Sequence, residues 1–259
     1  MGLIIVDAFI VTTDPVPVYG GVRFPEEEMS RLAEQIRRGG LPMLGNHDER
    51  LRLKPRLLDV DVRHTNSGPL GVWVEFEIDE EAWKAAEEAM GGIGGFSVSV
   101  VEKYRRGETD PSKPFVGLAS DAGHFDDDLR DEVAEALRPY FDVSSTRLYQ
   151  FAESPPAKVV IEFGVPLLIF IQSVGVNVFS NALWHGLKLF LHEKQAKVAK
   201  LTYFVFTIRR ADGTLVRCFM RTADDKVLKH ALDRMTEIAD SPGSTFNYDE
   251  EHGRWNEEE

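Results

Sequence analysis

Short runs of alternating apolar and polar residues dominate the first eighty positions of the chain. Residues 2–12 are rich in Ile and Val and predict a strand. The runs 57–64 and 70–78 both alternate, and the Asn, Ser, Gly and Pro between them are turn residues, so these runs predict a hairpin. Pro25 and the three Glu residues after it predict the start of a helix, which a glycine pair ends at positions 39 and 40.

A second helix and a short strand complete this region. Asp79 is suited to cap the helix, and small residues, mostly Ala, recur along one of its sides until two glycines at positions 91 and 92 end it. Residues 96–101 predict a short strand that starts directly after a further glycine pair.

The second half of the chain has a different succession of elements. Residues 126–140 and 223–239 carry apolar residues at helical spacing and predict two helices. Strands are expected at 143–151 and 157–163, and a hairpin is expected over 201–221 around an Ala-Asp-Gly turn. This order indicates an α+β module.

The longest apolar stretch lies between residues 165 and 192. The overlapping run from 163 to 184 has about the length of a membrane span. It also contains Gln172, two Asn and two Ser residues, which are costly in lipid unless other helices satisfy them. The sequence therefore favours a buried helix that covers a sheet, with membrane contact through 163–184 as the less favoured alternative.

These patterns divide the chain into four parts. Residues 1–105 form an N-terminal domain, and residues 106–124, which are polar and rich in Gly and Pro, form a linker. Residues 125–246 form a smaller α+β module with the long apolar helix. Residues 247–259 form an acidic tail that is ordered only in part.

Composition narrows the class of function. The 259-residue chain has a formal net charge of -13, which argues against a phosphate-binding surface and hence against nucleic acid as a partner. The single cysteine, Cys218, allows no internal disulfide, and the scattered histidines lack the spacing of a metal site. We therefore expect neither a metal nor a cofactor. A cytoplasmic location is expected, because the apolar N-terminal run lacks the basic start of a signal peptide.

Two segments carry the residue types of a serine hydrolase. His47 follows the first helix and a loop, whereas Ser97 follows a glycine pair and opens a strand. Such a hydrolase needs a hydroxyl nucleophile, a base in hydrogen-bonding reach, a group that orients the base, and donors for the oxyanion. A histidine and a serine fifty residues apart occur in most proteins, so this spacing alone does not define a site.

The order of motifs around these two residues is more specific. Pro42 leads to His47-Asp48, the hairpin arm from Leu70 ends at Asp79, and a helix that ends in glycine precedes Gly95-Phe96-Ser97. This order, over roughly residues 1–105, resembles the prohead maturation proteases of tailed phages, a family related in fold to the herpesvirus assembly proteases. The resemblance implies a β-barrel-like assembly-protease domain with flanking helices, followed by the smaller module. It also implies Ser97 as nucleophile, His47 as general base, and a role in phage or prophage capsid maturation.

The third catalytic member is less defined. Glu75 and Glu77 share one face of the neighbouring strand, and we expect Glu75, or alternatively Glu77, to orient His47. His64 at the hairpin end is a weaker candidate. The family often has Gly two residues after the serine, where this chain has Ser99, and Ser99 is therefore a fallback nucleophile.

Two classes of function follow from the sequence. The first is a serine endopeptidase that performs limited proteolysis of assembly proteins or of itself, with a homo-oligomer as an open alternative to a monomer. The second is a non-enzymatic adaptor that keeps the protease fold and uses its C-terminal module to bind a partner or a membrane.

Overall fold

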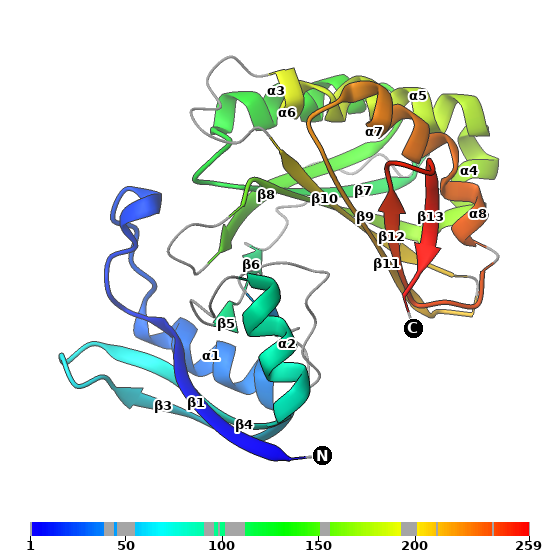
Figure 1. Cartoon of the computed structure of the whole chain (residues 1–259). Helices are drawn as coiled ribbons and strands as arrows, with labels where there is room; N and C mark the ends of the chain where they lie inside the picture. Colours follow the sequence, from blue (N-terminus) through cyan, green and yellow to red (C-terminus); the bar gives the residue numbers. More distant parts are fainter. Residues whose placement is uncertain are drawn as a thin grey trace. The chain divides into compact units, whose positions relative to one another are not determined.

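The protein is α+β and divides into two compact units (Figure 1). The computed structural model describes residues 2–38, 44–45, 55–90, 96–97, 99–101, 112–150, 156–192, 201–210, 212–239 and 241–258. The first unit comprises residues 1–100 and 150–155, and the second comprises residues 101–149 and 156–259. The second unit is therefore the larger one, and the expectation of a smaller C-terminal module is wrong.

The first unit contains a three-stranded antiparallel sheet in the order β1-β4-β3. Its strands are β1 (Leu3–Thr12), β4 (Leu70–Asp79) and β3 (Arg56–His64). The first strand and the hairpin predicted from the alternating runs are confirmed. A short helical turn, η1 (Pro17–Tyr19), follows β1.

One helix covers one face of this sheet and forms the core of the unit. Helix α1 (Glu26–Arg37) begins after Pro25, with three Glu residues in its first turn that suit the positive end of the helix dipole. The buried residues of the core are Met29, Leu32, Ala33 and Ile36 of α1 and Val60, Val72, Val74, Phe76 and Ile78 of the sheet. Because side chains alternate along a strand, the residues between these on β4 face away from α1.

The remaining elements of the first unit are a helix and two very short strands. Helix α2 (Glu80–Met90) follows β4, and Asp79 Oδ1 accepts hydrogen bonds from the N–H groups of Glu81 and Ala82, as predicted for a cap. β2 (Leu44–Gly45) and β5 (Phe96–Ser97) form a separate two-stranded sheet. The described strands of this unit thus form open sheets, and the barrel-like domain stays an inference from the resemblance.

The second unit is built on an eight-stranded mixed sheet in the order β13-β12-β11-β10-β9-β7-β8-β6. Its strands are β6 (Ser99–Val101), β7 (Phe115–Asp121), β8 (Asp142–Gln150), β9 (Lys158–Pro166), β10 (Thr202–Arg209), β11 (Leu215–Thr222), β12 (Thr245–Asp249) and β13 (Arg254–Glu257). The chain passes from the first unit to the second within β6.

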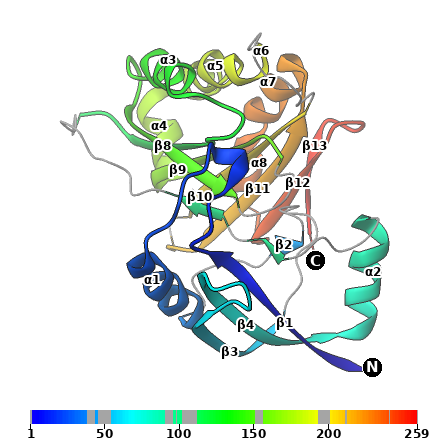
Figure 2. The ribbon, with the colours of Figure 1, turned by 90° about the vertical axis from the view of Figure 1, so that its left-hand side faces the viewer.

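Helices cover one face of this sheet, as Figures 1 and 2 show. They are α3 (Asp127–Leu137), α4 (Leu167–Val174), α5 (Val176–Leu187), α6 (Leu189–His192), α7 (Asp225–Asp233) and α8 (Met235–Ala239). Their apolar sides and the facing strand residues form one core that is rich in phenylalanine.

Two segments expected to be irregular are strands. Residues 115–121 of the expected linker form β7, which pairs with β8 on one side and with β9 on the other. Residues 106–111 of that linker lie outside the described residues. The tail expected from residue 247 contributes to the antiparallel pair of β12 and β13, in which Tyr248 lies opposite Trp255.

The long apolar run forms three helices in place of the one that was expected. Gly175 separates α4 from α5 at a positive φ of 83°, a backbone conformation that suits glycine and interrupts the helix. Phe170 of α4 and Phe179 of α5 are buried in the core, so the run covers the sheet as predicted. Among the described helices none is long and apolar enough to cross a membrane.

The phenylalanine cluster beneath α4 yields a test of this core. The ring centroid of Phe170 lies 5.2 Å from those of Phe141 and Phe163 and 5.6 Å from that of Phe179. We expect Phe170→Ala to lower the free energy of unfolding of the second unit by about 3–5 kcal/mol, because it leaves a cavity among these rings.

Ile169→Ala is the matched control, because the neighbouring Ile169 is 54% exposed. This substitution should change the free energy of unfolding by less than about 0.5 kcal/mol. Hydrogen exchange read on peptides from β7 and β9 measures both effects. Unchanged protection in the Phe170 variant would contradict the packing described above.

Candidate functional site

Ser97 lies on β5, which pairs with β2. The pairing is antiparallel, with Ser97 opposite Leu44 and Phe96 opposite Gly45. β5 also contacts β1, so the segment that carries Ser97 lies beside the larger sheet of the same unit. The residues 46–50 and 91–95 that flank this ladder lie outside the described residues.

His47 is among those residues, two positions after Gly45 in the sequence. Directly opposite residues of an antiparallel pair have Cα atoms about 4.5–5.5 Å apart. The β2–β5 ladder therefore brings the segment that leads into His47 alongside the segment that carries Ser97.

Ser99 belongs to a different sheet. It opens β6, at the end of the eight-stranded sheet, whereas Ser97 ends β5. The single strand expected over 96–101 is therefore two short strands, with residue 98 between them outside the described residues. Ser97 and Ser99 are two positions apart in the sequence, yet their backbones belong to different sheets.

Glu75 stands in a row of three carboxylates across the first sheet. Its directly opposite neighbours are Asp7 on β1 and Asp59 on β3. Like charges directly opposite each other destabilise a sheet unless other groups compensate. Asp59 accepts a hydrogen bond from the backbone N–H of Val60 at 2.8 Å, and Asp7 accepts one from the indole N–H of Trp73 at 3.0 Å. No cation is paired with Glu75 in the described part of the chain.

Glu77 has a partner of its own. Its Oε2 lies 3.1 Å from Nε of Arg56, a pair in which Arg56 is 72% exposed, so the pair is worth less than about 1 kcal/mol. Glu75 and Glu77 both face away from α1, whereas Figure 1 draws β5 on the side of the sheet where α1 lies. No described contact joins either glutamate to β2 or β5, so nothing supports the expectation that one of them orients His47.

His64 is occupied by its own hairpin. Its Nδ1 lies 2.7 Å from the carbonyl oxygen of Gly68 and donates to it across the turn between β3 and β4. The side chain is exposed. This contact explains His64 as a turn residue.

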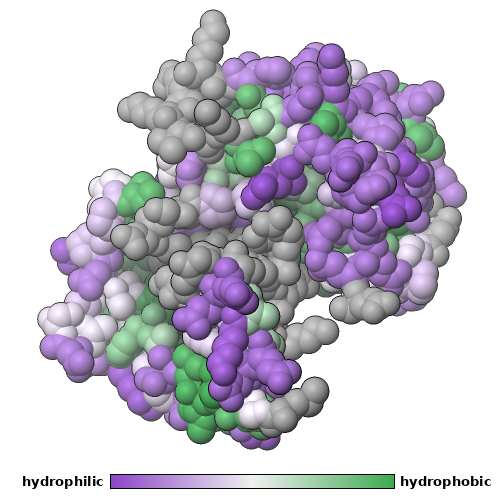
Figure 3. Space-filling view, viewed as in Figure 1, coloured by the Kyte–Doolittle hydropathy of each residue, from purple (hydrophilic) through white to green (hydrophobic). Residues whose placement is uncertain are grey.

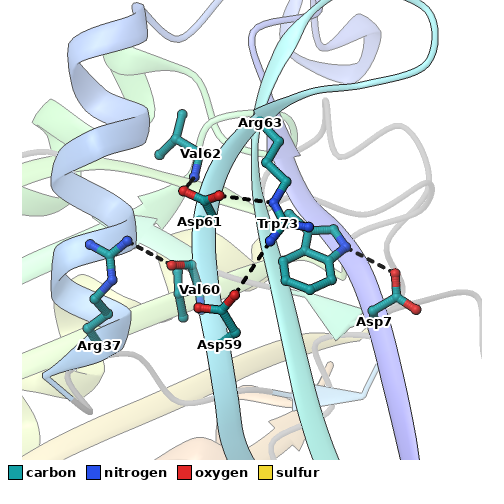
Figure 4. A network of polar contacts seen from close by, with 8 residues as sticks. All are labelled: Asp7, Arg37, Asp59, Val60, Asp61, Val62, Arg63 and Trp73. Atoms are coloured by element: carbon teal, nitrogen blue, oxygen red, sulfur yellow. Dashed lines mark hydrogen bonds and ion pairs between the residues drawn. The ribbon is translucent and has the colours of Figure 1, made fainter.

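Sequence reasoning missed a polar network on the outward face of the same sheet (Figure 4). The guanidinium carbon of Arg63 lies 3.7 Å from the centroid of the Trp73 ring, an arrangement that favours a cation–π interaction. Arg63 Nε donates to Asp61 at 3.0 Å, and this bond holds the pKa of the Asp61 carboxyl below its ordinary value. Alternation signals which residues share this face, but Asp7 joins the network only through a pairing that is distant in sequence.

A second carboxylate–histidine pair, also missed, lies in the second unit. Nδ1 of His124 is 2.6 Å from Oδ2 of Asp121, and Asp121 is fully buried at the end of β7. No hydrogen bond joins the other ring nitrogen to a hydroxyl group of a described residue, so the described residues supply no nucleophile for this pair. The thiol of Cys218, on β11, is a separate case. Burial raises its pKa, which argues against Cys218 as a thiolate nucleophile.

The described residues hold no group of three or more His, Cys, Asp or Glu side chains that could bind a metal ion. Comparison of the chain with protein-family models, with curated proteins and with solved structures gives no match. The case for a site in the first unit thus rests on the β2–β5 ladder and on the sequence.

The ladder can be tested with engineered cysteine pairs. Leu44→Cys with Ser97→Cys, and Gly45→Cys with Phe96→Cys, place thiols on directly opposite residues at a separation that a disulfide can span. We expect at least one of these double variants to form an internal disulfide under mild oxidation, seen as a linked peptide pair in a non-reducing digest. The buried Cys218 should not compete.

The four single-cysteine variants are the controls for this test and should give no internal link to Cys218. If neither double variant forms its disulfide while the proteins remain folded by circular dichroism, the β2–β5 register is wrong.

Proposed function

We propose that the first unit is a serine endopeptidase in which Ser97 is the nucleophile and His47 the general base. The observation that carries the proposal is the β2–β5 ladder, which pairs the strand of Ser97 with the strand that ends two residues before His47. His47 and Ser97 themselves are fifty residues apart in sequence. The motif order that resembles prohead proteases supports the same two residues.

The chemistry follows from the properties of the two groups. A serine hydroxyl is a weak nucleophile until a base accepts its proton, and a neutral imidazole is suited to that role. Ser97 attacks the peptide carbonyl as His47 takes the hydroxyl proton, and the imidazolium then protonates the leaving amine. Water, activated by the same imidazole, hydrolyses the acyl-enzyme and returns Ser97 to its starting state.

The proposal assigns no residue to orient His47. Glu75 and Glu77 face the side of the sheet opposite α1, and Glu77 is paired with Arg56. An orienting carboxylate or carbonyl from another part of the first unit is compatible with the same chemistry.

Fold and biological role are proposed from the same resemblance. We infer that the β1-β4-β3 sheet and the β2–β5 ladder belong to one assembly-protease fold, with α1 and α2 as the flanking helices. The substrate is then an assembly protein of a phage or prophage, or the chain itself. The peptidase acts in the cytoplasm.

One observation favours the adaptor as a second candidate. The second unit is the larger one and has its own extensive core, which limited proteolysis by the first unit does not require. An adaptor would keep the first unit as a scaffold and bind its partner through the second.

Substitution of the two proposed catalytic residues separates these candidates. We expect Ser97→Ala and His47→Ala each to abolish cleavage, and the double variant to show no further loss, because the two residues act as one unit. Ser99→Ala is the matched control and should keep cleavage, as should Glu75→Gln and Glu77→Gln. Mass spectrometry of fragments from the protein, expressed alone and with an assembly-protein substrate, measures the outcome. Identical fragments from wild type and Ser97→Ala would exclude the proposed protease activity and leave the adaptor as the candidate function.

A further inference from the structure

β1 is an edge strand of the first unit. β4 pairs with one side of β1, and among the described strands no other is paired with it. An edge strand offers a row of backbone N–H and C=O groups to which another strand can add. Folded proteins usually protect such an edge with charged side chains, especially Lys, with Pro or with a bulge. Between Leu3 and Phe9, β1 has no Lys, no Pro and no bulge, since its register shift falls between Phe9 and Val11, and Asp7 is its one charged residue.

The outward-facing side chains of this edge are apolar and exposed. Leu3 and Ile5 are each 63% exposed, and Phe9 is 38% exposed. They alternate with Ile4 and Val6, which pack only partly into the core beneath α1. Figure 3 shows a hydrophobic area low on the face in view, where Figure 1 draws β1. Contiguous exposed apolar residues on an unpaired edge are typical of an interaction surface.

Negative charge borders this apolar strip. The outward face carries the carboxylates of Asp7, Asp59, Asp61, Glu75 and Glu77 and the guanidinium groups of Arg56 and Arg63. Both arginines are already paired, Arg56 with Glu77 and Arg63 with Asp59 and Asp61. Asp7 and Glu75, on the two strands nearest the free edge, are the carboxylates of this face that no cation of a described residue pairs with, and Asp59 and Asp61 share one arginine.

We propose that the β1 edge binds an extended segment of a protein partner in which Lys or Arg alternates with apolar residues. The backbone of this segment pairs with β1 as an additional strand. Its apolar side chains pack beside Ile4 and Val6 on one face. On the other face the aliphatic stems of its cations cover Leu3 and Ile5, and their charged ends reach Asp7 and Glu75.

Charge argues against a second copy of this chain as the occupant. Two copies joined through β1 would bring a second Asp7 and Glu75 to a face that already has an excess of carboxylates. Each copy also carries a formal net charge of -13. The inference uses neither Ser97 nor His47, so it stands apart from the proposed peptidase activity.

The test uses a fluorescent peptide of four Lys-Val repeats and the full-length protein. We expect saturable binding in fluorescence anisotropy, weaker by about five- to tenfold for Glu75→Gln and for Ile5→Ser, which corresponds to about 1–1.4 kcal/mol. Glu27→Gln on α1 and Val18→Ser on η1 are the matched controls, because both positions are exposed and off the sheet, and both should bind as wild type does. Hydrogen exchange should show new protection of the β1 amides when the peptide is bound, which a purely ionic contact would not produce.

Several results would overturn the proposal. The first two are that the Lys-Val peptide does not bind, and that a peptide of four Glu-Val repeats binds with the same affinity. The others are that Glu75→Gln and Ile5→Ser bind the Lys-Val peptide as tightly as wild type does, and that binding leaves the hydrogen exchange of the β1 amides unchanged. A dimer in analytical ultracentrifugation that Ile5→Ser dissociates would assign the edge to a second copy.

Discussion

The pairing of Leu44–Gly45 with Phe96–Ser97 is the constraint on which the candidate site depends. The ladder is only two residues long, yet it joins two segments that are distant in sequence, one that leads to the proposed base His47 and one that carries the proposed nucleophile Ser97. A short ladder contributes little stability by itself. The core between α1 and the first sheet must therefore supply the rigidity that a catalytic pair needs.

Local patterns predict elements well where one face is buried and the other is wet. The hairpin of β3 and β4 alternates along both arms, and α1 follows a proline and three glutamates. β7 escaped prediction because it is buried on both faces and therefore has no alternation, and its pairing with β8 and β9 is not local. The acidic C-terminal residues form a hairpin because Tyr248 and Trp255 contact each other and pack on the core of the second unit. This apolar packing stabilises the hairpin although the residues around it are polar.

For the site, the sequence predicted which residue types belong together but not which side of the sheet they face. Glu75 and Glu77 share a face, as alternation required, and that face is opposite α1. Periodicity gives the relation between neighbours on one strand, whereas the choice of the buried side depends on where α1 packs. The same outward face holds the carboxylate row and the exposed strip of β1, two features that become apparent only when β1 is placed beside β4.

Direct chemical modification of the proposed nucleophile tests the central claim. A fluorophosphonate reacts with a serine only when a neighbouring base activates its hydroxyl. The account predicts one covalent adduct, located by mass spectrometry on Ser97, and its loss in His47→Ala while circular dichroism stays unchanged. No adduct on the folded wild-type protein, or an adduct that forms equally well without His47, would contradict a Ser97–His47 catalytic pair.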